Sequence, residues 1–382
     1  MITRIGASQY RCLKKVSQSL GHFQILVGPN GSGKSVFMDT LAFVRTLLSA
    51  NLEEAVRERS RNFDDLIWDR QGHQFDLAIE AQIPDIQNKQ FDGVRYFLRV
   101  RAGTDTLGVE REELMMLGTG DSSFGPVLMD RSEQRVQFWD EKGQELNSHA
   151  LNRKLSALTH VIPDRSKFSA TLGLAELLRE GVYTIALTSS ALQLPSPPLL
   201  QSEARTLDGS HLPWWVARLQ EKSPELFREW VAHLRTCIPD LTSVRSVQRP
   251  EDQHRYLMIE YESNVTLPSW VVSDGTLRLL ALTIIAYMPN HGLIYSIEEP
   301  ENGVHPTAIE AIYQSLSSVY DGQVLVASHS PILLNLAKPE ELLCFSKTAE
   351  GTQIVSGKDH PALRDWKGEV NLSDLFAAGV LG

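Results

Sequence analysis

One short segment carries the residue types that phosphate binding requires. Positions 28–35 read Gly-Pro-Asn-Gly-Ser-Gly-Lys-Ser and match the pattern G-x-x-x-x-G-K-[ST] at every fixed position. Glycines let the backbone wrap closely, so that successive N–H groups point at phosphate oxygens. This pattern places Lys34 for the β- and γ-phosphates and the Ser35 hydroxyl for Mg²⁺. We therefore predict a nucleotide site formed by Gly28, Pro29, Asn30, Gly31, Ser32, Gly33, Lys34, Ser35 and Val36.

A second segment supplies acids. The apolar run 293–297 ends in Glu298 and Glu299. Because ligands of open α/β folds bind at the carboxyl edge of the sheet, acids there are placed for chemistry. We predict that Glu298 serves Mg²⁺ through water and that Glu299 orients or deprotonates an attacking water. A strand that simply ends in solvated glutamates is the alternative, and the phosphate loop upstream disfavours it.

Two further segments have a functional and a structural interpretation. The apolar run 324–327 leads to Ser328 and His329, and an imidazole there could donate to a γ-phosphate. Ser273 and Gly275 precede an apolar helical pattern, and a hydroxyl with free N–H groups at a helix start can bind an anion. The alternatives are a structural histidine and a simple helix cap. The order of the motifs along the chain decides between them.

The elements that must position these residues follow an α/β pattern. Residues 2–8 and 23–27 are expected to be strands, and a helix is expected over 34–49. A strand at 256–261 marks the return of this pattern later in the chain. After it we expect helices at 276–288 and 307–319, and strands at 293–297, 323–327 and 342–345.

The middle of the chain has a different periodicity. Alternation at 75–83 and 94–100 predicts two antiparallel strands. Helical spacing at 172–179 and 214–234 indicates a mostly helical lobe. We therefore expect a split α/β domain, formed by 1–140 and 255–382, with a helical lobe inserted at 141–254.

Composition and charge indicate which classes of protein the chain can belong to. The chain has 382 residues and a net charge of −10, which argues against a protein that coats nucleic acid. Residues 1–38 nevertheless hold no Asp or Glu. The apolar stretch at 279–288 is too short to span a bilayer, and the start reads as a strand rather than as a signal peptide. We expect a cytoplasmic protein without a membrane partner, in which Cys12, Cys237 and Cys344 are buried small hydrophobes.

The order of the motifs resembles the ABC-type ATPase head. The phosphate loop is followed by a Ser-x-Gly helix start at 273–275, an acidic strand ending at 298–299 and a strand that leads to His329. The segments Glu298-Glu-Pro-Glu-Asn-Gly-Val-His-Pro306 and Ser328-His-Ser-Pro331 are similar to those of the RecF/SMC-like branch. Within that branch they resemble AAA-family ATPases related to OLD proteins. The expected fold is therefore a P-loop NTPase with a mixed sheet, additional antiparallel strands and the inserted lobe.

This resemblance implies roles for individual residues. Such heads form a homodimer head to tail and hold ATP between one subunit's phosphate loop and the other's signature helix. Ser273 and Gly275 are then expected to contact the γ-phosphate in trans. Glu299 is the expected catalytic base, Glu298 the acid on the Mg²⁺ side and His329 the γ-phosphate sensor. The resemblance also places Arg11 near the phosphates and the loop 301–305 at the opposite subunit.

Departures from the family pattern narrow the expected function. The chain has Glu298 where most ABC proteins have Asp, and Ser-Asp-Gly-Thr where many have Ser-Gly-Gly. Only 53 residues follow His329, too few for the Toprim domain of OLD nucleases, so we expect no nuclease activity in this chain. We expect ATP hydrolysis that regulates a separately encoded effector, nuclease or toxin-like, or that acts on DNA, in anti-phage defence or DNA repair.

Three alternatives remain open on the sequence. The chain could be a scaffold that binds ATP with negligible turnover, or a transporter ATPase, which the signature and the long insertion disfavour. DNA could be contacted directly by scattered basic residues, although solvated surface charge is the simpler interpretation. The candidates for such contact are Arg4, Lys14, Lys15, Arg245, Arg249 and Arg255.

Overall fold

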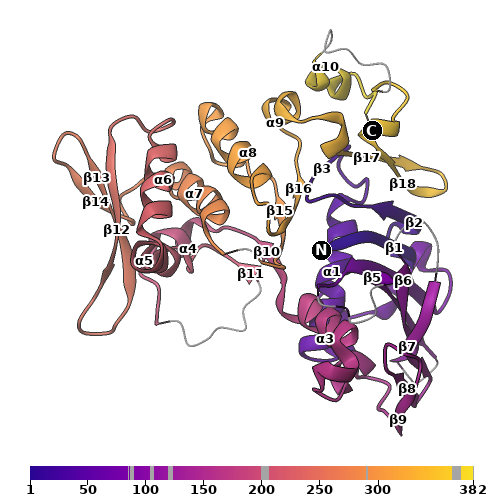
Figure 1. Cartoon of the computed structure of the whole chain (residues 1–382). Coiled ribbons are helices and arrows are strands. Elements are labelled where there is room, and N and C mark those ends of the chain that lie inside the picture. Colours follow the sequence, from indigo (N-terminus) through magenta and orange to yellow (C-terminus); the bar gives the residue numbers. More distant parts are fainter. Residues whose placement is uncertain are drawn as a thin grey trace.

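The computed structural model describes residues 1–84, 86, 90–103, 107–118, 124–198, 206–289, 291–363 and 371–381. Its centre is a sheet in the order β11-β10-β15-β16-β3-β17-β18 (Figure 1). In that order the strands span Thr206–Leu207, Val182–Ile185, Ile294–Glu298, Gln323–Ala327, Phe23–Val27, Leu342–Thr348 and Gly351–Ser356. All neighbours are parallel except β17 and β18. The ends of β3, β15 and β16, which carry the motifs, therefore lie at one edge of the sheet.

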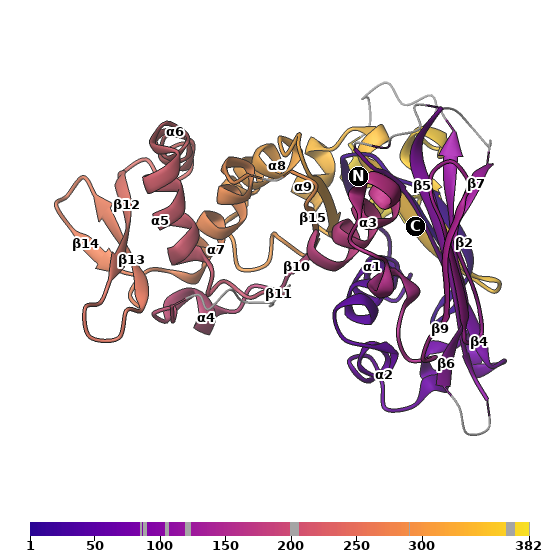
Figure 2. The ribbon, with the colours of Figure 1, turned by 60° about the horizontal axis from the view of Figure 1, so that its bottom comes forward.

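A second, fully antiparallel sheet lies beside the first. Its order is β2-β1-β4-β5-β6-β7-β8-β9. These strands span, in that order, Leu13–Ser19, Ile2–Tyr10, Gln74–Gln82, Phe91–Ala102, Leu107–Gly118, Phe124–Ser132, Arg135–Trp139 and Glu145–Ala150. A third, small antiparallel sheet consists of β12 (Leu241–Gln248), β13 (Arg255–Tyr261) and β14 (Thr266–Pro268). The small sheet and the eight-stranded sheet lie at opposite ends of the molecule (Figures 1 and 2).

Helices pack on both faces of the central sheet. On the side of the eight-stranded sheet lie α1 (Lys34–Ser49), α2 (Leu52–Arg57) and α3 (Arg165–Glu180). The other face carries α7 (Asp274–Thr283), α8 (Ile309–Ser317) and α9 (Pro331–Leu336). The same hydrophobic core extends to α5 (Leu212–Lys222) and α6 (Pro224–Leu234), which pack against the small sheet. Two short helices remain, α4 (Ser189–Gln193) and α10 (Leu372–Ala377), and α10 packs on α9.

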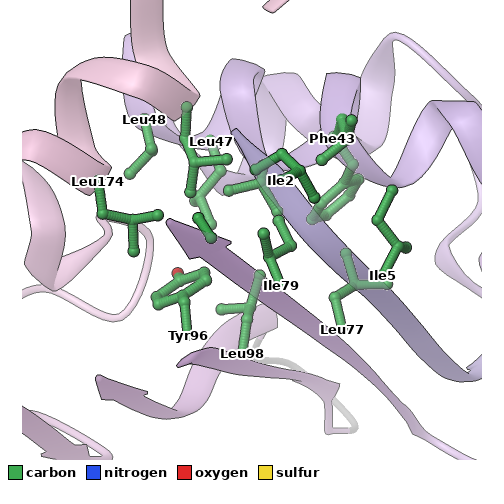
Figure 3. Packing of buried hydrophobic residues seen from close by; sticks show 14 of the residues in the cluster. Ile2, Ile5, Phe43, Leu47, Leu48, Leu77, Ile79, Tyr96, Leu98 and Leu174 are labelled. Carbon is green, nitrogen blue, oxygen red and sulfur yellow. The ribbon is translucent and has the colours of Figure 1, made fainter. Parts of the chain in front are cut away.

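The alternation of side chains along β3 shows why four of its five residues are apolar. Leu26 faces the core shared with α1 and the eight-stranded sheet, whereas Phe23, Ile25 and Val27 face the core on the other side. A strand covered on both faces needs no polar alternation. Figure 3 shows the first core, where Phe43 and Leu47 of α1 meet Ile2, Leu77 and other strand residues.

Most of the expected elements are confirmed. The strands at 2–8, 23–27, 293–297, 323–327 and 342–345 are present, and the helix over 34–49 has the expected bounds. The strands at 75–83 and 94–100 pair antiparallel, as β4 and β5. The helices at 276–288 and 307–319 are shorter than expected, because α7 ends at Thr283 and α8 begins at Ile309. Short 3-10 segments complete both.

Two later segments have the expected secondary structure but differ in its arrangement. A single helix over 214–234 does not form, because it is interrupted between α5 and α6. Pro224 lacks the N–H that a continuous helix needs, and it forces Ser223 out of the helical region, to φ −143°. The strand at 256–261 exists as β13, but it belongs to the small antiparallel sheet and not to the central one.

The range 141–254 contains strands as well as helices. It includes α3 to α6, but β10 and β11 of the same range pair in the central sheet. The proposed division into a split domain and an inserted lobe therefore stays a prediction. Within the described residues, no helix combines the length and the apolar character that crossing a membrane demands.

Candidate active site

A cavity of about 460 Å³ opens at the carboxyl ends of β3, β15 and β16. It brings together five segments that are separate in the sequence, at 11–12, 30–36, 65, 298–299 and 327–329. The residues that line it are Arg11, Cys12, Asn30, Gly31, Gly33, Lys34, Ser35, Val36, Asp65, Glu298, Glu299, Ala327 and His329. The sequence predicted ten of these thirteen residues, and the topology of the sheet explains why they meet.

The phosphate loop has a shape that only glycine permits at two positions. Gly28 has φ +148°, and a Cβ there would lie 2.2 Å from the carbonyl oxygen of Phe345 on β17. Gly33 has φ +103°, and a Cβ there would lie 2.6 Å from Oγ1 of Thr352 on β18. Thr352 Oγ1 also donates to the Ser32 carbonyl at 2.8 Å. The hairpin of β17 and β18 therefore supports the loop from behind.

Lys34 is held inside the loop. Its Nζ donates to the carbonyl oxygens of Gly28 at 2.7 Å and Pro29 at 3.0 Å. Burial lowers the pKa of Lys34, and the carboxylates of Glu299 and Glu298 oppose that shift. Of the nine predicted nucleotide contacts, Gly28, Pro29 and Ser32 do not line the cavity. The first two serve Lys34 through their carbonyls.

Glu299 adopts a strained backbone conformation. Its φ is +47°, a region that costs a residue other than glycine about 1–3 kcal/mol. Its N–H donates to the Ala327 carbonyl at 2.8 Å, and its carboxylate accepts a hydrogen bond from Asn302 Nδ2. Two neighbours therefore fix the acid in the cavity wall. Strain of this kind is concentrated at functional sites.

His329 lies across the same cavity. Burial, and then the positive charge of Lys34, lower the pKa of His329, while Glu299 and Glu301 oppose the shift. The imidazole is therefore neutral at neutral pH, with one nitrogen able to donate and one able to accept. On its other side the ring of Phe376 in α10 lies 6.2 Å away, centroid to centroid.

The donor set suits Mg²⁺ that shares its ligands with phosphate and water. The Ser35 hydroxyl and Glu298 line one cavity. In the part of the chain that the structure describes, no cluster of three His, Cys, Asp or Glu residues could hold a metal ion by itself. Mg²⁺ commonly binds through one or two protein ligands and completes its shell with water and substrate phosphates. The residues present fit that pattern.

Ser273 and Gly275 do not line the cavity. Ser273 is exposed and caps α7, because its Oγ accepts from the Thr276 N–H at 3.2 Å. A Cβ on Gly275 would lie 2.6 Å from the carbonyl oxygen of Gly303, so α7 begins directly against the loop that follows Glu299. The helix cap that sequence analysis weighed is present, and the Ser273 side chain remains accessible from outside.

Arg11 reaches the cavity from the turn between β1 and β2. Its Nη1 lies 3.5 Å from Asp39, which also accepts from Arg59 and, at 2.7 Å, from the hydroxyl of the buried Tyr10.

Sequence reasoning missed Cys12, Asp65 and Ala327 as cavity residues. Cys12 could have been found because it is the neighbour of Arg11, a predicted site residue. No motif around Asp65 indicates that it lines the cavity. Of the three cysteines, only Cys344 is fully buried, so the expectation for Cys12 and Cys237 was too simple.

The basic residues considered for DNA contact are mostly engaged in ion pairs. Arg4 pairs with Glu80, Lys14 with Glu350, Arg245 with Glu260, Arg249 with Asp252 and Arg255 with Glu221. Surface pairs of this kind favour the interpretation as solvated charge. Direct DNA contact through these residues stays a prediction.

Comparison with known proteins agrees with the geometry. The family model described as AAA domain, putative AbiEii toxin, Type IV TA system matches residues 23–193 and 233–335. The OLD nuclease of Thermus scotoductus is 22% identical over 397 residues, which cover 98% of this chain and 68% of that protein.

Solved SMC heads share the fold. An SmcHead bound to the C-winged helix domain of ScpA aligns with a TM-score of 0.56 and 17% identity, over 93% of this chain and 96% of that one. The Smc head domain of Pyrococcus furiosus, with an extended coiled coil and bound to the C-terminal domain of ScpA, aligns with a TM-score of 0.51 and 13% identity, over 99% and 98%. The chain belongs to the family described as AAA domain, putative AbiEii toxin, Type IV TA system; it has the fold of the solved SMC heads and is similar in sequence to an OLD nuclease.

Proposed function

We propose that this chain binds and hydrolyses ATP with Mg²⁺. The observation that carries the proposal is the single cavity shared by Lys34, Ser35, Glu298, Glu299 and His329. These residues are the parts that phosphoryl transfer to water requires: a phosphate cradle, a hydroxyl for the metal ion, an acid for the attacking water and a hydrogen-bond donor.

Each residue has a distinct task in this proposal. The N–H groups of the loop and Lys34 hold the β- and γ-phosphates, so Lys34 exchanges its loop carbonyls for phosphate oxygens. Glu299 accepts a proton from the attacking water, and the neutral His329 donates to the γ-phosphate. Bound Mg²⁺ supplies charge neutralisation, with Ser35 as a ligand and Glu298 acting through water.

The site is completed by a second copy of the chain. We assign Ser273 and Gly275 to the γ-phosphate of the opposite subunit in a head-to-tail homodimer. The support is that Ser273 is exposed at the N-terminus of α7 and outside its own cavity. A helix N-terminus directs free N–H groups and a positive dipole end towards an anion.

The biological role that we propose is control of a separate effector, or action on DNA, in anti-phage defence or DNA repair. The related Thermus protein is named a nuclease, the family description names a toxin system, and both similar SMC heads are bound to a partner protein. ATP-dependent co-purification of one defined partner, abolished by Lys34→Ala, is the expected result. Binding that persists unchanged in that variant argues against control by ATP.

Hydrolysis is tested by phosphate release from ATP. We expect Lys34→Ala and Glu299→Gln to reduce turnover by at least about a hundredfold, because each removes a group that acts in the transition state. Glu310→Gln, an exposed change on α8, serves as the control and should leave the rate unchanged. Equal rates in wild type and both site variants contradict the proposal.

One observation favours a second candidate, an ATP-dependent scaffold with negligible turnover. The Glu299 carboxylate already accepts from Asn302, which reduces its capacity to act as a base. A purified protein that retains ATP, bound and unhydrolysed, is the result this candidate predicts. If the purified protein, without any partner, hydrolyses ATP to ADP and phosphate, the scaffold candidate is excluded.

A further inference from the structure

The loop after β15 reaches the turn that carries His329. Glu301 Oε1 accepts a hydrogen bond from Ser328 Oγ at 2.7 Å and another from the His329 N–H at 3.0 Å. The partners are 27 and 28 positions away in the sequence. One carboxylate oxygen thus joins the acidic strand loop to the histidine turn. Hydrogen bonds to a charged acceptor are among the stronger ones in proteins.

The histidine turn is rigid around this contact. Ser328 Oγ, which donates to Glu301, also accepts from the Ser330 N–H at 3.0 Å. Ser330 in turn caps α9, since its Oγ accepts from the Leu333 N–H at 3.3 Å. Ser328 and Ser330 are both buried, whereas the His329 side chain lines the cavity. Removing Glu301 therefore leaves the Ser328 hydroxyl and the His329 N–H without their acceptor.

A contribution to stability alone does not explain why a carboxylate occupies position 301. Its other oxygen, Oε2, is buried and has no hydrogen-bond partner among the described residues. An unsatisfied buried acceptor is costly, and a charged one more so. The same loop also contributes Asn302, which donates to Glu299. The loop 299–302 therefore touches both the acid and the histidine that face the γ-phosphate in the proposed reaction.

We infer that Glu301 is a positioning residue, which holds the His329 backbone so that the imidazole meets the γ-phosphate. This inference rests on the proposed ATP hydrolysis and adds to it a residue that does not itself line the cavity. It also makes one loop responsible for the relative placement of Glu299 and His329.

A double-mutant cycle in ATP turnover tests the inference. Glu301→Ala should lower kcat about tenfold, the equivalent of ~1.4 kcal/mol, while the KM for ATP changes less than about twofold. Glu301→Gln keeps an oxygen acceptor and should restore most of kcat. If Glu301 acts through His329, then Glu301→Ala should cost less than about twofold in a His329→Ala background. If kcat of the double variant falls by the product of the two single-variant losses, the inference is overturned.

A measurement without turnover separates this inference from the proposed function. In protein with labelled histidines, the imidazole resonances of His329, assigned with His329→Ala, should shift in Glu301→Ala and stay in place in the control Glu310→Ala. A shift in a protein that hydrolyses no ATP supports the positioning role and contradicts the proposed function. Unmoved His329 resonances in an active protein contradict the positioning role alone.

Discussion

At the scale of single residues, the acid in the cavity wall is the most constrained group. Glu299 combines a φ of +47° with hydrogen bonds at its N–H and its carboxylate. The amide of Asn302 is the side-chain contact that fixes its orientation. General-base catalysis depends on such an orientation, because the base must lie within hydrogen-bond reach of the water it deprotonates.

We expect Asn302→Ala to lower kcat for ATP about five- to tenfold, with little change in KM, because a freed Glu299 samples other rotamers. Steady-state phosphate release measures both constants. Asn302→Asp, which places a second carboxylate beside Glu299, should be at least as damaging. A rise in turnover in Asn302→Ala contradicts this expectation and indicates that Asn302 restrains hydrolysis.

Residues that belong to a local pattern could be predicted from the sequence. Lys34, Ser35, Glu298 and Glu299 follow directly from motifs whose residue types match their chemistry. The contacts of Glu301 and Asp65 could not be predicted, because each depends on a segment that only the tertiary fold brings near. The hydrogen bond from His329 to Glu301 spans 28 positions, and no periodicity encodes it.

At the scale of elements, the hairpin of β17 and β18 supports the phosphate loop. Thr352→Val keeps the volume of the side chain but removes the hydrogen bond to the Ser32 carbonyl. We expect the Kd for ATP to rise about three- to tenfold, as the loss of one such bond implies. Titration with a fluorescent ATP analogue measures the change. Thr348→Val removes a bond of equal length, 2.8 Å, elsewhere in the hairpin and should leave the Kd as in wild type.

The start of α5 makes stability depend on pH. Burial lowers the pKa of His211 to about 4, and its Nδ1 has no hydrogen-bond partner among the described residues. Its unfolded pKa is near 6.5, so between these values the unfolded chain binds the extra proton and stability falls as pH falls. We expect His211 to cost about 2 kcal/mol of unfolding free energy between pH 7.5 and 5.

Urea unfolding at pH 7.5 and at pH 5 tests this dependence. His211→Asn lacks the titrating ring and should lose that part of the pH dependence, whatever its absolute stability. The exposed His291 provides the control, since His291→Asn should keep the wild-type dependence. An unchanged difference between the two pH values in His211→Asn refutes the assignment.

Which elements could be predicted depended on where they pack. The strands β3, β15 and β16 are buried on both faces and consist mostly of apolar residues, so they were found with nearly correct bounds. Strands β6 to β9 were not predicted. Their outward faces carry many charged residues, such as Arg111 and Glu113 of β6, and only pairing with β5 and with each other reveals them.

At the scale of the whole molecule, the central sheet separates two hydrophobic cores and gathers the motifs at one edge. The cavity contains every proposed catalytic group except Ser273 and Gly275. Those two residues lie at the start of α7, where Gly275 packs against Gly303 and Val304 of its own chain. In the proposed head-to-tail dimer, each ATP site combines the cavity of one copy with the start of α7 of the other.

Mixing two inactive variants tests this central claim most directly. Lys34→Ala removes the side chain that holds the β- and γ-phosphates in the cavity. Ser273→Asp keeps a good helix cap but places a negative charge that repels the γ-phosphate. Each variant alone should therefore be inactive. In a mixed dimer one composite site takes its loop from the Ser273→Asp chain and its α7 from the Lys34→Ala chain. We predict that phosphate release in the equimolar mixture recovers to about a quarter of the wild-type rate, because half of the dimers are mixed and each has one intact site. A mixture as inactive as its components, beside an active wild type, contradicts the composite site.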